Sequence, residues 1–161
     1  MSRIKNKFEY LKQKKQKAFG VFLTAGYPSL KYSKDIFKKI LDSKVDFIEI
    51  GLPFSDPMAD GPLIQRSSQI AIQQNMSVQK CLKIVEDIRK INDDIPIILM
   101  GYYNPIHYYG NSKFIKNAVS SGIDGLIIVD LPMEEDEELY NLAYKNNLPL
   151  IRLVTPTTNE I

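Results

Sequence analysis

Two carboxylic acids, Glu49 and Asp60, have the sequence surroundings expected of catalytic groups. Glu49 lies near the end of residues 45–50, a β-branched and aromatic run that predicts a strand. Both faces of this strand carry apolar residues, as parallel strands do when they are covered on both sides. We therefore expect burial to raise the pKa of Glu49 and to suit it to acid–base catalysis. The alternatives are a carboxylate that reaches water or one that pairs with a basic side chain distant in the sequence.

Asp60 lies in the loop that follows this strand, and that loop is stiffened. Its polar and restrictive residues are Pro53, Ser55, Asp56, Pro57 and Asp60, and a glycine stands at each end. Prolines restrict the backbone and glycines permit sharp turns. Loops at the carboxyl ends of parallel strands are where α/β folds place their sites. Asp60 is thus a second candidate catalytic acid, although it could also cap the helix that Pro62 begins.

The wider chain alternates between strand and helix patterns in units of roughly 25 to 30 residues, which predicts a parallel α/β sheet. The predicted strands are residues 18–25, 45–50, 95–101, 123–129 and 148–154. The predicted helices are residues 4–11, 30–41 with Ser29 as its cap, 62–74, 78–91, 112–121 and 134–146. No linker or low-complexity segment divides the chain, so residues 1–161 are predicted to form one domain.

Composition excludes several classes of protein. The formal net charge of the 161 residues is +2, which gives no broad electrostatic case for nucleic-acid binding. No apolar run reaches membrane-spanning length, and the start lacks a secretory segment. The single cysteine, Cys81, fits a reducing compartment, so a cytoplasmic protein is predicted. His107 is the only histidine, so neither a metal site nor a Ser-His triad is predicted.

Several motifs resemble the tryptophan synthase alpha subunit family. They are Ile48-Glu49-Ile50-Gly51, Pro53-Phe54-Ser55-Asp56-Pro57 and Ala59-Asp60-Gly61, with further agreement at residues 99–105, 130–132 and 155–158. The resemblance implies a (β/α)8 TIM barrel of which only about the first five strand–helix units are present. It also implies a lyase of tryptophan biosynthesis that cleaves indole-3-glycerol phosphate to indole and glyceraldehyde 3-phosphate by a retro-aldol reaction, without a cofactor.

The resemblance also assigns roles to individual residues. It implies that Glu49 and Asp60 are the catalytic pair. It places Phe22, Tyr102, Val129 and Leu153 around the indole. From the residues alone, Phe22 and Tyr102 could instead be barrel-core packing.

A partner is implied as well. The family forms an α2β2 heterotetramer with a beta subunit that carries pyridoxal phosphate, and Asp56, Pro57 and Met58 would lie toward that interface. Packing of this loop within its own chain is the alternative. The phosphate-binding turns and closing loop of the family follow later strands and are absent here, so this segment alone is expected to be inactive. The rival interpretations are another phosphorylated-sugar barrel enzyme and a non-catalytic fragment that activates a partner.

Overall fold

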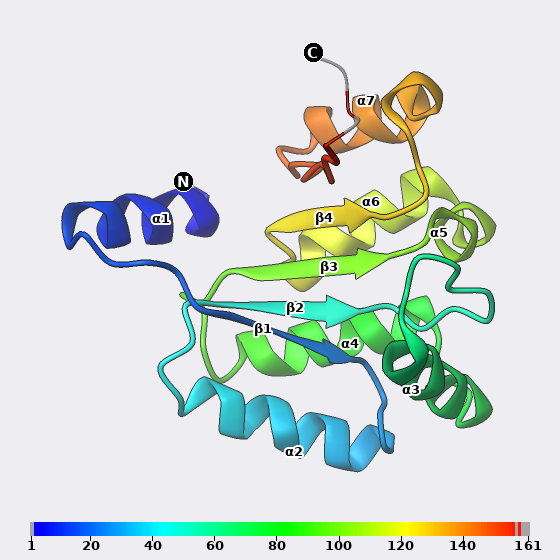
Figure 1. Cartoon of the computed structure of the whole chain (residues 1–161), viewed down its shortest axis with the longest axis horizontal. Coiled ribbons are helices and arrows are strands. Elements are labelled where there is room, and N and C mark those ends of the chain that lie inside the picture. Colours follow the sequence, from blue (N-terminus) through cyan, green and yellow to red (C-terminus); the bar gives the residue numbers. More distant parts are fainter. Residues whose placement is uncertain (1, 157, 159–161) are drawn as a thin grey trace.

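Four parallel strands form the centre of the molecule in the order β1-β2-β3-β4 (Figure 1). The computed structural model describes residues 2–156 and residue 158. The strands are β1 (Gly20–Thr24), β2 (Phe47–Gly51), β3 (Ile97–Gly101) and β4 (Gly125–Ile128). Each pairs with the next in parallel, which requires a crossover between strands. The fold is therefore part of a (β/α)8 barrel, as predicted.

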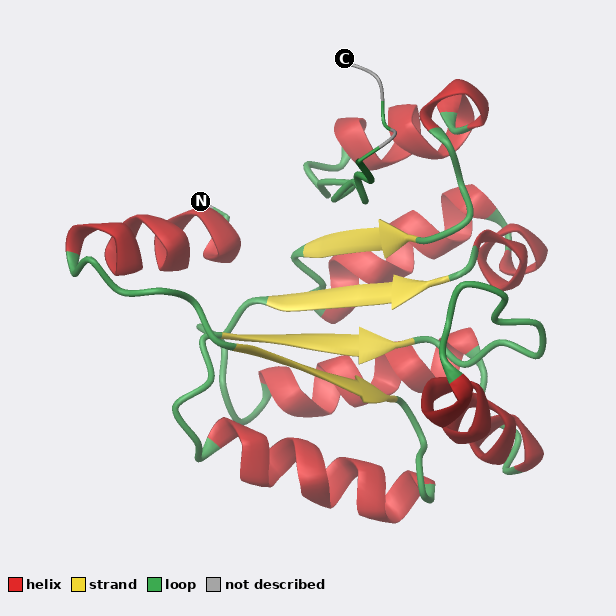
Figure 2. Cartoon of the chain, in the orientation of Figure 1, coloured by secondary structure: helices red, strands yellow, loops and turns green. Residues whose placement is uncertain are grey.

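Helices provide the crossovers and cover the sheet (Figure 2). They are α1 (Arg3–Gln13), α2 (Leu30–Leu41), α3 (Pro62–Gln73), α4 (Val78–Arg89), α5 (Tyr103–Tyr109), α6 (Asn111–Ser121) and α7 (Glu137–Lys145), with a 3-10 turn at Met133–Glu135. Helix α1 lies beyond the amino ends of the strands (Figure 1). Within the described residues, none of these helices has the length and apolar character needed to span a membrane.

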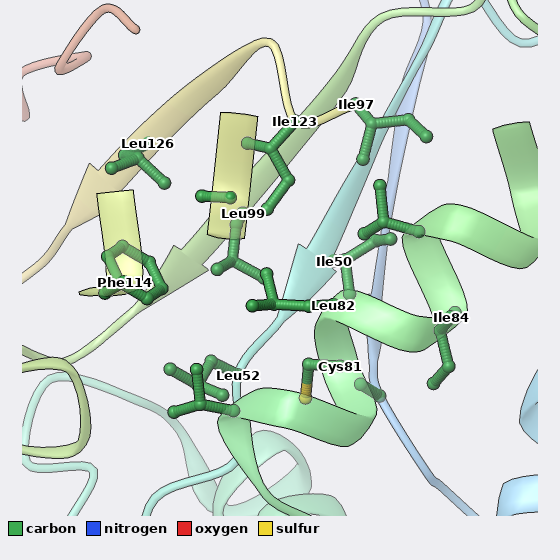
Figure 3. Close-up of a cluster of buried hydrophobic side chains, with 14 of the residues drawn as sticks. Ile50, Leu52, Cys81, Leu82, Ile84, Ile97, Leu99, Phe114, Ile123 and Leu126 are labelled. Carbon is green, nitrogen blue, oxygen red and sulfur yellow. The ribbon is translucent and has the colours of Figure 1, made fainter. Parts of the chain in front are cut away.

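The core lies between the sheet and the helices that follow its strands. Ile48 and Ile50 are fully buried, as the alternation along β2 predicts. They join Leu82 of α4 and Leu99 of β3 in one apolar cluster (Figure 3). Burying one such side chain stabilises the fold by roughly 1.5–3 kcal/mol. The opposite face of β2 was expected to be dry, but Glu49 there is only half-buried, because the four strands do not close into a barrel.

A buried ion pair fixes the amino ends of β3 and β4. Asp124, directly before β4, accepts hydrogen bonds from Arg89 Nη2 at 2.6 Å and Arg3 Nη1 at 3.0 Å. It also accepts one from the backbone amide of Ile97 at 2.9 Å. The side chains of Arg89 and Asp124 are only 9% and 7% exposed. This cluster therefore joins α1, α4 and two strands at the end of the sheet opposite the predicted site.

The predicted strand at residues 148–154 is wrong. Only one isolated parallel bridge forms there, between Leu126 and Leu150. The amide of Leu126 donates to the carbonyl of Pro149, and the amide of Ile151 donates to the carbonyl of Leu126. Proline has no amide hydrogen, and no described strand lies beyond this segment to extend the ladder. The segment thus follows β4 in parallel, as expected, without becoming a strand.

Helix α5 was not predicted. The predicted helices leave residues 103–109 out, yet Tyr103–Tyr109 are helical. A proline is compatible with the first helical turn because the amides there have no partner within the helix. The Asp130 carboxylate accepts a hydrogen bond from the first amide of α5, that of Tyr103, at 2.7 Å. This contact joins residues that are 27 positions apart in the sequence, and it helps to start a helix that the local sequence pattern does not predict.

Candidate active site

Glu49 is the middle residue of β2, two residues before the strand ends at Gly51, and lies on the face opposite the buried isoleucines. Its neighbours in the parallel register are Phe22 on β1 and Ile98 on β3. Among the described residues, no basic side chain forms an ion pair with it. Burial without a compensating charge raises the pKa of Glu49. The alternative of pairing with a distant basic residue therefore finds no support, and burial favours the protonated form of Glu49 relative to that of an exposed glutamate.

Asp60 is held at the end of the loop by two side chains. The Tyr102 hydroxyl donates to Asp60 Oδ2 at 3.1 Å, and Gln65 Nε2 donates to the Asp60 carbonyl at 2.9 Å. The N-cap of α3 is Gly61, and no side chain caps this helix end. Asp60 therefore does not cap α3, and the capping alternative is wrong. Its side chain faces Tyr102 at the end of β3 instead.

A small hollow at the carboxyl ends of the strands brings together Asp60 and three of the four residues predicted to surround the indole, Phe22, Tyr102 and Val129. It is lined by Phe22, Thr24, Gly51, Leu52, Asp60, Ile64, Ser68, Met100, Gly101, Tyr102 and Val129. Phe22 lies over Gly51, where an added Cβ would come within 2.5 Å of the ring. Phe22 is thus a neighbour of Asp60 in the hollow and of Glu49 in the sheet. Glu49 itself is not among the residues that line the hollow, so Phe22 is the residue that neighbours both acids.

Leu153 does not share this hollow. Its side chain is 56% exposed, and it lies in the irregular segment that was expected to form a fifth strand. Because this segment does not pair as a strand, Leu153 is not held by a strand register at the carboxyl ends of β1 to β4. Its assignment to an indole pocket stays a prediction.

The three predicted interface residues differ in exposure. Asp56 is exposed, and its carboxylate accepts a hydrogen bond from the Ser55 hydroxyl. Pro57 is buried within its own chain, whereas Met58 is 81% exposed. Packing inside the chain therefore explains Pro57, and of the three predicted interface residues only Asp56 and Met58 are exposed.

Polar residues that the sequence reading did not single out also lie at the hollow. Thr24 Oγ1 and Ser67 Oγ are 2.7 Å apart, and Ser68 is 5% exposed. The signal that could have found them is the pair of serines, Ser67 and Ser68, amid the apolar residues of α3. In the described part of the chain, no cluster of three or more His, Cys, Asp or Glu side chains is placed to bind a metal ion.

Comparison with known proteins identifies the family of this chain. The family model described as "Tryptophan synthase alpha chain" matches residues 8–161. The chain belongs to the tryptophan synthase alpha family. A tryptophan synthase alpha chain from Desulfatibacillum aliphaticivorans is 49% identical over 160 residues, which are 99% of this chain and 60% of the relative. This chain therefore spans about 60% of the length of that curated alpha chain.

Solved structures show the same likeness to the alpha family. The alpha subunit from Legionella pneumophila str. Paris matches with a TM-score of 0.96 at 40% identity, over 99% of this chain and 61% of that one. A tryptophan synthase complex from Pyrococcus furiosus matches with a TM-score of 0.82 at 36% identity, over 89% of this chain and 59% of that one. The four-stranded sheet of this chain and its helices thus correspond to about 60% of a larger alpha-family structure.

Proposed function

We propose that this chain carries the catalytic acids of an indole-3-glycerol phosphate lyase, the alpha chain of a tryptophan synthase. The reaction is a retro-aldol cleavage to indole and glyceraldehyde 3-phosphate in tryptophan biosynthesis. One observation carries the proposal. Glu49 is half-buried without an ion-pair partner among the described residues, and its neighbour in the sheet, Phe22, lines the hollow together with an Asp60 that Tyr102 holds. Two carboxyl groups in different environments are the arrangement expected for acid–base work.

Glu49 serves both proton transfers in this proposal. Cleavage breaks the bond between indole C3 and the first side-chain carbon. C3 gains a proton, and the hydroxyl on that carbon loses one as it becomes the aldehyde. A single carboxyl with a raised pKa is able to give the first proton and accept the second. Its place on a strand, in register with Phe22 and Ile98, keeps it fixed during both transfers.

Asp60 stabilises the charge that this chemistry creates. Protonation at C3 leaves positive charge on the indole nitrogen, and a nearby carboxylate stabilises it. The aromatic and apolar wall of the hollow, formed by Phe22, Tyr102 and Val129, suits a flat apolar ring beside that carboxylate. The reaction uses protons and fixed charge, so this chain needs no cofactor for it.

The proposed partner is a tryptophan synthase beta subunit that binds pyridoxal phosphate, in an α2β2 complex. The exposed Asp56 and Met58 on the loop beside the hollow are its proposed contacts in this chain. The likeness to the Pyrococcus furiosus tryptophan synthase complex supports a partner subunit, and the two contact residues are part of the proposal. The buried thiol of Cys81 and the absence of any other cysteine fit a cytoplasmic enzyme.

Indole release tests the proposal. The 161 residues are assayed alone and as a chimera joined to the remaining segment of the Desulfatibacillum relative. We expect negligible indole from the isolated chain, since no phosphate-binding turn has been identified in it, and clear release from the chimera. Glu49→Gln and Asp60→Asn should each lower kcat of the chimera by about 10²- to 10⁴-fold.

Matched controls keep this result interpretable. Glu138→Gln and Asp94→Asn make the same chemical changes at exposed positions remote from the hollow and should leave kcat unchanged. Circular dichroism and cooperative thermal unfolding establish that each chimera is folded. A folded chimera that releases no indole, or one whose Glu49→Gln variant is fully active, would overturn the proposed function.

A further inference from the structure

Tyr102 directly follows β3, and both its ring and its hydroxyl make contacts at the site. The residue is 3% exposed, and its ring packs against that of Phe54 with centroids 5.4 Å apart. Its hydroxyl oxygen accepts a hydrogen bond from the backbone amide of Ala59 at 3.0 Å. The same hydroxyl donates to Asp60 Oδ2 at 3.1 Å. The phenol therefore bonds to two successive residues of the loop.

These two contacts fix the direction of the hydroxyl proton. A tyrosine hydroxyl has one proton to donate. Because Ala59 occupies an acceptor position of the oxygen, the proton is directed to Asp60. The Asp60 main chain is held separately, through the bond from Gln65 to its carbonyl. The carboxylate thus has a set orientation in which no described residue donates to its second oxygen, Oδ1.

We propose that Tyr102 is a positioning residue for Asp60. Its hydroxyl holds the Asp60 carboxylate so that Oδ1 is free to accept a hydrogen bond from the indole N–H. This inference rests on the proposed function and adds a role for the hydroxyl to the packing role of the ring. A carboxylate on a loop has a freely rotating side chain unless a partner fixes it. Preorganising it avoids a reorientation cost as charge develops on the substrate.

The ionisation of Tyr102 agrees with a donor role. Burial is the largest influence and raises its pKa, while the bond from Ala59 lowers it. The hydrogen bond to Asp60 and the charge of that carboxylate raise it further. Tyr102 therefore keeps its proton at neutral pH, as a hydrogen-bond donor must.

Turnover of the active chimera tests the role. Tyr102→Phe keeps the ring and its packing and removes only the hydroxyl. Loss of one hydrogen bond to a charged group should lower kcat by about 10- to 100-fold. KM should change by less than about threefold, because the aromatic ring at this position still lines the hollow. Tyr108→Phe makes the same change at a side chain that is 93% exposed and should leave both constants unchanged.

A spectroscopic titration tests the contact without any catalysis. In the 161-residue chain with tyrosines labelled at Cζ, the Tyr102 signal is assigned by its loss in Tyr102→Phe. Asp60→Asn should shift the Tyr102 pKa downward, because the negative neighbour is removed. Asp94→Asn should not move it. An unchanged Tyr102 pKa in Asp60→Asn would show that the contact is absent and would overturn the inference.

The outcomes separate the two proposals. A folded wild-type chimera without activity overturns the proposed function, and the positioning role with it. An active chimera whose Tyr102→Phe variant keeps its kcat overturns the positioning role alone. A loss of kcat together with the shifted Tyr102 titration supports both.

Discussion

Replacing Asp124 with alanine should destabilise the fold by about 4 kcal/mol, because this carboxylate is buried and shared by three donors. Removing one partner of a buried ion pair costs about 3–5 kcal/mol. Arg89 would keep its bonds to the carbonyls of Gly122 and Ile95, which places the loss near the lower end. The amide of Ile97 would lose its side-chain acceptor, which adds roughly 1 kcal/mol.

The state of Arg89 supports this magnitude. Burial lowers the pKa of its guanidinium, so its charge is already costly to keep in this position. Without Asp124, that charge would remain buried beside carbonyl dipoles and without its close counter-ion. The loss of stability thus comes mainly from leaving the Arg89 guanidinium buried without its counter-ion, rather than from the strength of the Arg89–Asp124 contact itself.

Equilibrium unfolding in urea measures the effect, with Asp93→Ala as the matched control. Asp93 also pairs with Arg3, at 2.7 Å, but its side chain is 77% exposed. Exposed pairs contribute about 0–1 kcal/mol, so the control should be nearly as stable as the wild type. A loss of about 4 kcal/mol corresponds to a fall in Tm of roughly 8–16 °C for a chain of this length. The reasoning is refuted if Asp124→Ala loses no more stability than Asp93→Ala.

Three further outcomes follow from the site and the core. Burial raises the pKa of Glu49 in the folded state above its ordinary value of 4.5. The folded state therefore binds the Glu49 proton more tightly than the unfolded chain does, which stabilises the fold fully below pH 4.5, and this stabilisation is lost as the pH rises through the raised pKa. Glu49→Gln should therefore exceed the wild type in unfolding free energy at pH 7, with the gap closing toward pH 4.5 in a pH series of urea titrations. Gly51→Ala should cost about 1–3 kcal/mol and raise KM of the chimera, because its Cβ would displace the Phe22 ring; an unchanged KM would contradict this. Cys81 is buried with its pKa raised to about 12, so a thiol reagent should modify it only as the chain unfolds, and rapid labelling of the native chain would argue against that burial.

The local pattern predicted the elements that depend mainly on neighbouring residues. The alternation in β2 places Ile48 and Ile50 in the core and Glu49 on the other face, as expected. Helix α2 begins after Ser29, whose hydroxyl accepts a hydrogen bond from the amide of Tyr32 as predicted for a cap. These features need only the period of the strand or the chemistry of one helix end.

Features that depend on distant partners were missed. The strand expected at residues 148–154 shrinks to one bridge because pairing, rather than apolar character, makes a strand. Helix α5 has a first amide that bonds to Asp130, far along the chain. Neither partner is visible in the local sequence.

The sequence by itself determined that one acid, Glu49, lies in a strand and that a second, Asp60, lies in the stiff loop after it. It did not determine how the Asp60 side chain is held, because its partner Tyr102 lies 42 residues away. The β2–β3 register decides this contact by setting Gly51 opposite Met100, so that Tyr102 emerges beside the loop. Periodicity is a property of neighbouring residues, whereas strand register is set by packing of the whole sheet, and only the tertiary structure fixes it.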